Sequence, residues 1–171
     1  MKIGIITFHF AFNQGAVLQC YAMQKYLETL GHEAYVINYR PGYHTVMHSA
    51  WRNPFAYSHV FWKKFKNRSV PVRGLLTAKS FARSMYWNIT GVDRENQKVF
   101  RRFEEENLHL TREYKTLKEL QSAAPEMDAY ISGSDQVWNP DLLGQELDRA
   151  YFLDFGKKET KRIAYAVSMG K

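Results

Sequence analysis

Two short polar segments carry the side chains best suited to chemistry. The first, residues 9–15, reads HFAFNQG and offers an imidazole, two amides and a glycine. The second, residues 133–140, reads GSDQVWNP and offers a carboxylate, two amides and a tryptophan. His9 and Asp135 are the groups here that can take a proton from a hydroxyl or return one. They are therefore the candidate catalytic residues.

The first segment precedes an apolar pattern of helical spacing, so it should lie at a helix N-terminus. Unpaired backbone N–H groups there favour an anionic or hydroxyl-rich ligand, and Gly15 permits close backbone approach. Neither the G-x-G-x-x-G fingerprint nor a P-loop Gly-Lys-Ser/Thr is present, which disfavours dinucleotides and nucleoside triphosphates. Candidate substrate-binding residues are Asn13, Gly15 and Gln19. The alternative is that Asn13 only caps the helix, Gln19 supports the loop and His9 bonds to backbone.

The second segment has the mixture of groups found in carbohydrate sites. Trp138 could stack on a sugar ring, and the polar side chains could pair with its hydroxyls. The candidate substrate-binding residues are Gly133, Ser134, Gln136, Trp138 and Asn139. The alternative is that Ser134 and Asp135 cap a short helix while Trp138 lies in the core.

Four segments with apolar or β-branched runs predict the strands that position these loops: residues 2–8, 33–39, 128–132 and 162–168. A helix over residues 15–30, with Gly31 as its C-cap glycine, joins the first two as a β-α-β unit. Such units give parallel strands, and ligands bind at their carboxyl ends. We therefore predict an α/β, Rossmann-like, mainly parallel sheet with flanking helices.

Three further helices are expected between the second and third strands. The apolar face of the first could be formed by Leu75, Leu76, Phe81, Ala82, Met85, Tyr86 and Ile89. The pattern over residues 94–107 predicts Val99, Phe100 and Phe103 on the inner face and residues 104–106, all glutamates, on the outer face. Thr116 should cap a short helix, with Glu119 as its reciprocal partner. Because the last predicted strand has no helix after it to cover the sheet, we expect a second half beyond this chain.

The charge is concentrated in one region. The chain has 24 Lys and Arg against 17 Asp and Glu, yet no acidic residue lies between Glu33 and Asp93. We interpret residues 43–92 as a basic helical insert. Its cations and aromatics could form a solvated face, as is commonest. They could instead meet an anionic membrane surface through Lys63, Lys64 and Lys66, whereas nucleic acid is the least favoured partner.

The remaining composition suits an ordinary globular domain. The chain has 171 residues, 45% of them hydrophobic, and one cysteine, Cys20, which we expect in the core. No apolar run is long enough to span a bilayer, and no metal-ligand pattern occurs. We expect a cytoplasmic protein, with the inner membrane surface as a candidate peripheral location, and we expect neither cofactor nor metal.

Several of these motifs together resemble the polysaccharide pyruvyl transferase family. The most specific is SGSDQVWNP at residues 132–140; HFAFNQGAVLQ at 9–19, LGHE at 30–33, NYRP at 38–41, YFLDF at 151–155 and RIAYAVS at 162–168 also match its pattern. The resemblance implies a GT-B-type fold in two domains, with this chain, residues 1–171, as the N-terminal half. It further implies transfer of pyruvate from phosphoenolpyruvate to sugar hydroxyls of a cell-surface polysaccharide or its precursor, as a ketal.

The same resemblance implies that the donor-binding cations belong largely to the C-terminal half, so that this chain alone should be inactive. A different class of function stays open at this point: a non-catalytic carbohydrate-binding or assembly module. The enzyme reading expects the candidate residues at one shared crevice, whereas the binding or assembly reading expects them apart or buried.

Overall fold

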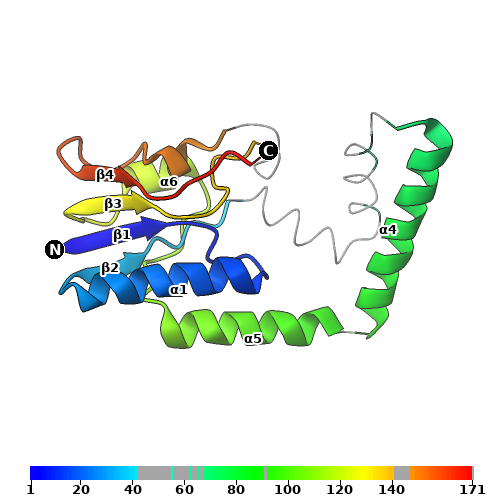
Figure 1. The fold of residues 1–171 in the computed structure, drawn as a ribbon, viewed down its shortest axis with the longest axis horizontal. Helices are drawn as coiled ribbons and strands as arrows, with labels where there is room; N and C mark the ends of the chain where they lie inside the picture. Colours follow the sequence, from blue (N-terminus) through cyan, green and yellow to red (C-terminus); the bar gives the residue numbers. More distant parts are fainter. Residues whose placement is uncertain are drawn as a thin grey trace. The chain divides into compact units, whose positions relative to one another are not determined.

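The computed structural model describes residues 1–41, 55, 62, 65, 68–90, 92–140 and 147–170. Its elements, in chain order, are β1 (Lys2–Ile6), α1 (Gln14–Thr29), β2 (Glu33–Val36), α4 (Val70–Thr90), α5 (Val92–Asn107), α6 (Leu117–Ser122), β3 (Ala129–Ser132), the 3-10 helix η1 (Arg149–Phe152) and β4 (Lys161–Ala164) (Figure 1).

The four strands form one sheet in the order β2-β1-β3-β4, and every neighbouring pair is parallel. This confirms the predicted α/β, Rossmann-like sheet with flanking helices. The first two strands are shorter than the predicted segments 2–8 and 33–39. In the structure β1 ends at Ile6 and β2 ends at Val36. The apolar residues that follow them are buried as loop rather than as strand, as Phe8 and Tyr39 are.

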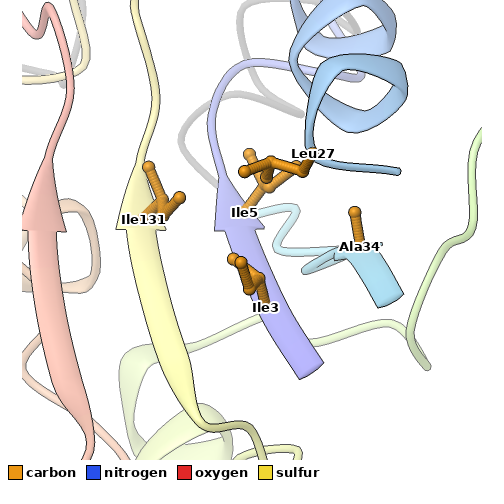
Figure 2. Close-up of a cluster of buried hydrophobic side chains, with 5 residues drawn as sticks. All are labelled: Ile3, Ile5, Leu27, Ala34 and Ile131. Atoms are coloured by element: carbon orange, nitrogen blue, oxygen red, sulfur yellow. The ribbon is translucent and has the colours of Figure 1, made fainter. Parts of the chain in front are cut away.

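One face of the sheet is covered by α1. Ile3 and Ile5 of β1 pack with Leu27 of α1, Ala34 of β2 and Ile131 of β3 in a buried cluster (Figure 2). Side chains alternate between the two faces of a strand, so these positions share one face. The register of β1 with β3 places Ile5 opposite Ile131, which puts the cluster in the centre of the sheet.

The opposite face is rich in aromatic side chains. Tyr130 of β3 meets the ring of Phe155 edge-on at 4.8 Å between centroids. Tyr151 of η1 meets Phe8 and Tyr39 in the same way, at 5.2 and 5.8 Å. The 3-10 helix η1 therefore contributes Tyr151 to this aromatic layer. By contrast, all four residues of β4 are exposed.

The ends of α1 match the sequence prediction. Asn13 is the N-cap, and its side chain accepts a hydrogen bond from Gly15 N. At the other end Gly31 has a φ of +78°. Gly31 N donates to Glu28 O at 2.9 Å and His32 N donates to Leu27 O at 3.1 Å. This is the paired hydrogen bonding of a Schellman C-cap, which places its glycine in the left-handed region.

We expect Gly31→Ala to lower the free energy of unfolding by about 1 kcal/mol, because an L side chain is strained at this φ. A Cβ would meet nothing within 4 Å at Gly31, so the backbone is the cause. Gly74, inside α4, has equally open surroundings, and Gly74→Ala should stabilise by roughly 0.5 to 1 kcal/mol. Urea denaturation of both variants measures the two changes in the free energy of unfolding. Equal changes would contradict the assignment of Gly31 to a left-handed C-cap position.

The predicted orientation of α5 is wrong at two positions. Val99 is 68% exposed, whereas Glu104, expected on the solvent face, is 2% exposed. Phe103 keeps its inward role, because its ring meets Tyr21 of α1 edge-on at 5.6 Å. Thr116 caps α6 as expected, but Glu119 accepts from Lys115 N, one residue before the cap.

The chain divides into two compact units. The first comprises Met1–Gly42 and Val99–Lys171 and contains the sheet, and the second is Tyr43–Lys98. Within the second unit the Arg73 guanidinium lies 3.9 Å from the centroid of the Trp62 ring. Lys63, Lys64 and Lys66 lie outside the described residues. Among the helices that the structure describes, none is long and apolar enough to cross a membrane.

Candidate functional site

The two candidate loops leave neighbouring strands at the same edge of the sheet. Ile6, the last residue of β1, is paired in parallel with Ser132, the last residue of β3. Gly133 N donates to Ile6 O at 3.0 Å, which holds the second loop against the first strand. A Cβ on Gly133 would lie 3.3 Å from Met23 Sδ and 3.5 Å from Thr7 Cβ. Glycine therefore allows the loops to start side by side.

The first loop is partly buried and partly exposed. Phe8, His9 and Phe10 are buried, whereas Asn13 and Gly15 are exposed at the start of α1. Gly15 N donates to Asn13 Oδ1 at 2.9 Å, so the capping alternative describes Asn13 as the structure has it. The exposed end of this loop leaves the start of α1 accessible.

Gln19 lies one turn into α1 and faces the root of the first loop. Its Oε1 is 3.5 Å from Thr7 Oγ1, at the far limit of a hydrogen bond. Its Nε2 is buried and has no hydrogen-bond partner among the residues that the structure describes. Cys20, the next residue, is fully buried as predicted, and burial raises the pKa of its thiol to about 12.

The imidazole of His9 is fully buried. Its Nδ1 lies 3.3 Å from Thr7 O, and its Nε2 lies 3.1 Å from Asn38 Oδ1. Burial, followed by the nearby Arg40 charge, lowers the pKa of His9 to about 4. At neutral pH His9 is therefore uncharged, and within the described chain its polar partners are Thr7 and Asn38 rather than the second loop.

The loop after β2 contributes a charged network of Asn38 and Arg40 with Glu104 of α5. The sequence did not indicate that this network lies at the carboxyl edge of the sheet, beside the two candidate loops. Arg40 Nε donates to Asn38 Oδ1 at 2.7 Å. Arg40 Nη2 forms an ion pair with Glu104 Oε2 of α5 at 2.5 Å. Burial raises the pKa of Glu104 against the opposing pull of Arg40. The pattern NYRP carried the signal for Asn38 and Arg40, while Glu104 gave none because its neighbours are acidic too.

The second loop is held by backbone hydrogen bonds rather than by a helix. Residues 133–140 form bends and a turn, so Ser134 and Asp135 cap no helix within them. Asp135 N donates to Gly133 O at 2.8 Å, and Ser168 N donates to Asp135 O at 3.1 Å. Trp138 N in turn donates to Ser168 O at 3.2 Å. The segment after β4 thus braces the loop.

Asp135 is half-buried at the centre of this loop. Its Oδ1 accepts a hydrogen bond from Gln136 N at 2.7 Å. Burial raises the pKa of the Asp135 carboxyl, and the Gln136 N–H opposes the rise. Oδ2 accepts no hydrogen bond from the residues that the structure describes. A half-buried carboxylate with a raised pKa and one uncommitted oxygen is suited to proton transfer.

The other residues of the loop are placed around it. Asn139 Nδ2 donates to Gln136 Oε1 at 2.9 Å, so the two amides pair with each other. The Trp138 ring stacks on Phe152 at 4.8 Å between centroids and 4° between planes. Trp138 Nε1 donates to Tyr151 O at 2.9 Å. One face of the indole and its N–H are therefore used within the protein, while the side chain remains half-buried.

Sequence reasoning missed one further aromatic group here. Tyr151 is fully buried between Phe8 and Tyr39, and its hydroxyl has no hydrogen-bond partner within the described chain. Burial raises the pKa of Tyr151, and Asp148, Tyr39 and Asp135 add to the rise. Its phenol is therefore protonated at neutral pH. The YFLDF motif contained it, but its apolar neighbours indicated only core.

The described side chains form no metal-binding cluster. Over the ranges that the structure describes, no three His, Cys, Asp or Glu residues gather closely enough to hold a metal ion. The arrangement offers instead a carboxylate, paired amides and a helix N-terminus at one edge of the sheet. These groups can bind hydroxyls and move a proton.

Comparison with known proteins agrees with the motifs. No curated protein and no solved structure gave a match. The family model described as polysaccharide pyruvyl transferase matches residues 13–171. This range covers the start of α1, the network after β2 and the whole of the second loop, and leaves out only the first twelve residues. Because the match spans nearly the entire chain, the protein belongs to the polysaccharide pyruvyl transferase family.

Proposed function

We propose that the intact protein transfers pyruvate from phosphoenolpyruvate to two hydroxyls of a sugar in a cell-surface polysaccharide or its precursor. The products are a cyclic ketal and inorganic phosphate. Both hydroxyl oxygens bond to C2 of the donor as the C2–O–phosphate bond breaks. One hydroxyl proton is taken up at the methylene carbon, which becomes a methyl group, and the other leaves with phosphate. The family match over residues 13–171 carries this proposal.

In this proposal Asp135 is the general base for the acceptor hydroxyl. Its support is the half-buried position, the raised pKa and the Oδ2 atom that accepts no hydrogen bond from the described residues. The acceptor lies against the second loop, where Gly133, Ser134, Gln136, Trp138 and Asn139 contribute, and against the exposed start of α1 at Asn13 and Gly15. Gln19 supports this edge from within α1, and His9 acts as a neutral imidazole.

The donor is a trianion and needs cations around it. At the carboxyl edge of the sheet the described residues supply Arg40, which is already paired with Glu104. We therefore place donor binding largely in a C-terminal half of GT-B type, with residues 1–171 as the N-terminal half. This chain then forms the acceptor wall of the site and is inactive alone.

The test is a transfer assay on the intact protein with phosphoenolpyruvate and a panel of sugar acceptors. We expect phosphate release that depends on the acceptor, together with an acid-labile pyruvate ketal detected by mass spectrometry. Acceptor binding without phosphate release or ketal would instead support the non-catalytic carbohydrate-binding or assembly module.

The location proposed is cytoplasmic, with the basic segment touching the inner membrane surface where lipid-linked acceptors would lie. Its support is the run of cations without acids between Glu33 and Asp93. Flotation with anionic vesicles, with and without charge reversal at Lys63, Lys64 and Lys66, is the measurement, and equal recovery would remove the membrane contact.

A further inference from the structure

A continuous polar chain runs from α5 to the first loop. Glu104 of α5 pairs with Arg40, Arg40 Nε donates to Asn38 Oδ1 at 2.7 Å, and the same oxygen lies 3.1 Å from His9 Nε2. Glu104 and His9 are buried at its two ends, at 2% and 0% exposure. Three separate parts of the chain are therefore linked through the Asn38 amide and the Arg40 guanidinium.

The Arg40 guanidinium decides which way this amide points. A guanidinium N–H can only donate, so the Asn38 atom that faces Arg40 Nε must be the oxygen. The same oxygen then faces His9 Nε2. An amide oxygen can only accept, so a neutral His9 bonds to it only with its proton on Nε2. The remaining nitrogen, Nδ1, then carries the lone pair.

A competing arrangement would suit His9 better if Arg40 were absent. With the Asn38 amide turned over, its Nδ2 would donate to the lone pair on His9 Nε2. The His9 proton would then sit on Nδ1 and could be donated to Thr7 O, 3.3 Å away. Every polar atom of the imidazole would be satisfied. With Arg40 in place, however, this orientation would set two donors against each other at the Asn38–Arg40 contact.

A third possibility is that His9 is doubly protonated, with a proton on each ring nitrogen, but this form is not populated near neutral pH. It could donate to both oxygens, but burial and the Arg40 charge hold the pKa of His9 near 4. Among the residues that the structure describes, the other groups close to the ring add no negative charge, since Phe10 meets it edge-on at 5.2 Å and Thr7 presents its carbonyl. The position of a single proton is therefore the variable that Arg40 controls.

We infer that Arg40 is a positioning residue that, through the Asn38 amide, keeps the His9 proton on Nε2 and leaves Nδ1 as the basic nitrogen. The placement of the proton does not depend on the proposed function; only its use in pyruvyl transfer does. His9 Nδ1 then makes no hydrogen bond with Thr7 O, so turning the imidazole toward a bound acceptor breaks only the bond at Nε2. In the first loop, the nitrogen of His9 that can accept a proton is therefore Nδ1 before any ligand binds.

The experiment is a long-range proton–nitrogen NMR spectrum of the full chain with nitrogen-15 histidine at pH 7. The chain has six histidines, so His9→Gln identifies the His9 signals by their loss. We expect the unchanged protein to show a protonated Nε2 and an unprotonated Nδ1 at His9. In Arg40→Met the amide is released, and the two nitrogens should exchange these states.

Arg112→Met is the matched control, because the exposed Arg112 guanidinium lies 4.7 Å from the Tyr114 ring centroid and its side chain takes no part in the chain of contacts. It should keep the Nε2-protonated form. A proton on Nδ1 in the unchanged protein would overturn the inference, as would an unaltered form in a folded Arg40→Met.

If Arg40→Met does not fold, Asn38→Ala provides the second variant, since only Thr7 O then remains as an acceptor and the proton should move to Nδ1. Retention of the proton on Nε2 in that variant would count against the inference. No substrate is needed for these spectra, so a failure of the transfer assay leaves the result intact and is distinguishable from it.

Discussion

Asp135→Asn should lower pyruvyl transfer by the intact protein roughly 100-fold or more, because an amide cannot take the proton of the acceptor hydroxyl. The loop should keep its shape. Asn retains an oxygen that can accept from Gln136 N, and the backbone bonds of residue 135 to Gly133 and Ser168 do not involve the side chain. Steady-state rates beside melting curves provide the measurement.

Asp128→Asn is the control for this substitution. Asp128 precedes β3 as Asp135 follows it, and its Oδ2 accepts from Lys2 N at 2.7 Å at the amino edge of the sheet. This variant should transfer pyruvate at the normal rate, because it lies at the opposite end of the strand. An Asp135→Asn protein with normal turnover would return Asp135 to a purely structural role.

Arg40→Met should destabilise the fold by about 3 kcal/mol or more at pH 8, because it leaves the Glu104 carboxylate buried without its cation. Glu104 is 2% exposed and its Oε2 lies 2.5 Å from Arg40 Nη2, so the guanidinium is the group that compensates its charge in the folded protein. Denaturant unfolding measures the loss. Arg40→Met with Glu104→Gln should recover most of it, since the uncompensated charge is then gone.

The deficit of Arg40→Met should shrink as the pH falls. Burial already raises the pKa of Glu104 in the folded protein, and loss of Arg40 removes the main opposing cause. Between the pKa of the unfolded chain and the raised pKa, the folded state binds more protons, so stability increases toward acid. The His9 pKa, which Arg40 helps to lower, changes in the same direction. A deficit that is equal at pH 5 and pH 8 would contradict a buried, unpaired carboxylate.

The sheet could be predicted because its signals are local. Each signal is contained in a short stretch of sequence: the β-branched runs at both ends of the chain, the periodic helix between two of them, and the glycine at a Schellman position. The parallel arrangement follows from that β-α-β unit. The strand ends could not be predicted, because Phe8 and Tyr39 are buried by Tyr151, more than a hundred positions later in the chain.

For the candidate site, the sequence predicted which loops form it but not the contacts between their side chains and the rest of the fold. The spacing of strand, glycine and polar residues indicated where they lie, and β1 and β3 are indeed adjacent. Glu104 shows why the rest could not follow. Among three consecutive glutamates nothing in the sequence marks the one that is buried, and its partner Arg40 lies 64 positions earlier. An ion pair of that kind is a product of tertiary packing.

The discontinuous sheet unit, Met1–Gly42 with Val99–Lys171, has a consequence for the order in which the chain can assemble. Pairing β1 with β2 closes only the loop that contains α1, whereas pairing β1 with β3 brings together residues such as Lys2 and Asp128, 126 positions apart. Closure entropy grows only with the logarithm of loop length, so the longer loop costs about 1 kcal/mol more. Long-range pairing nevertheless slows folding. The two loops proposed to form the acceptor wall thus belong to segments that are synthesised far apart. Gly133 reaches Thr7 only when β1 and β3 have paired.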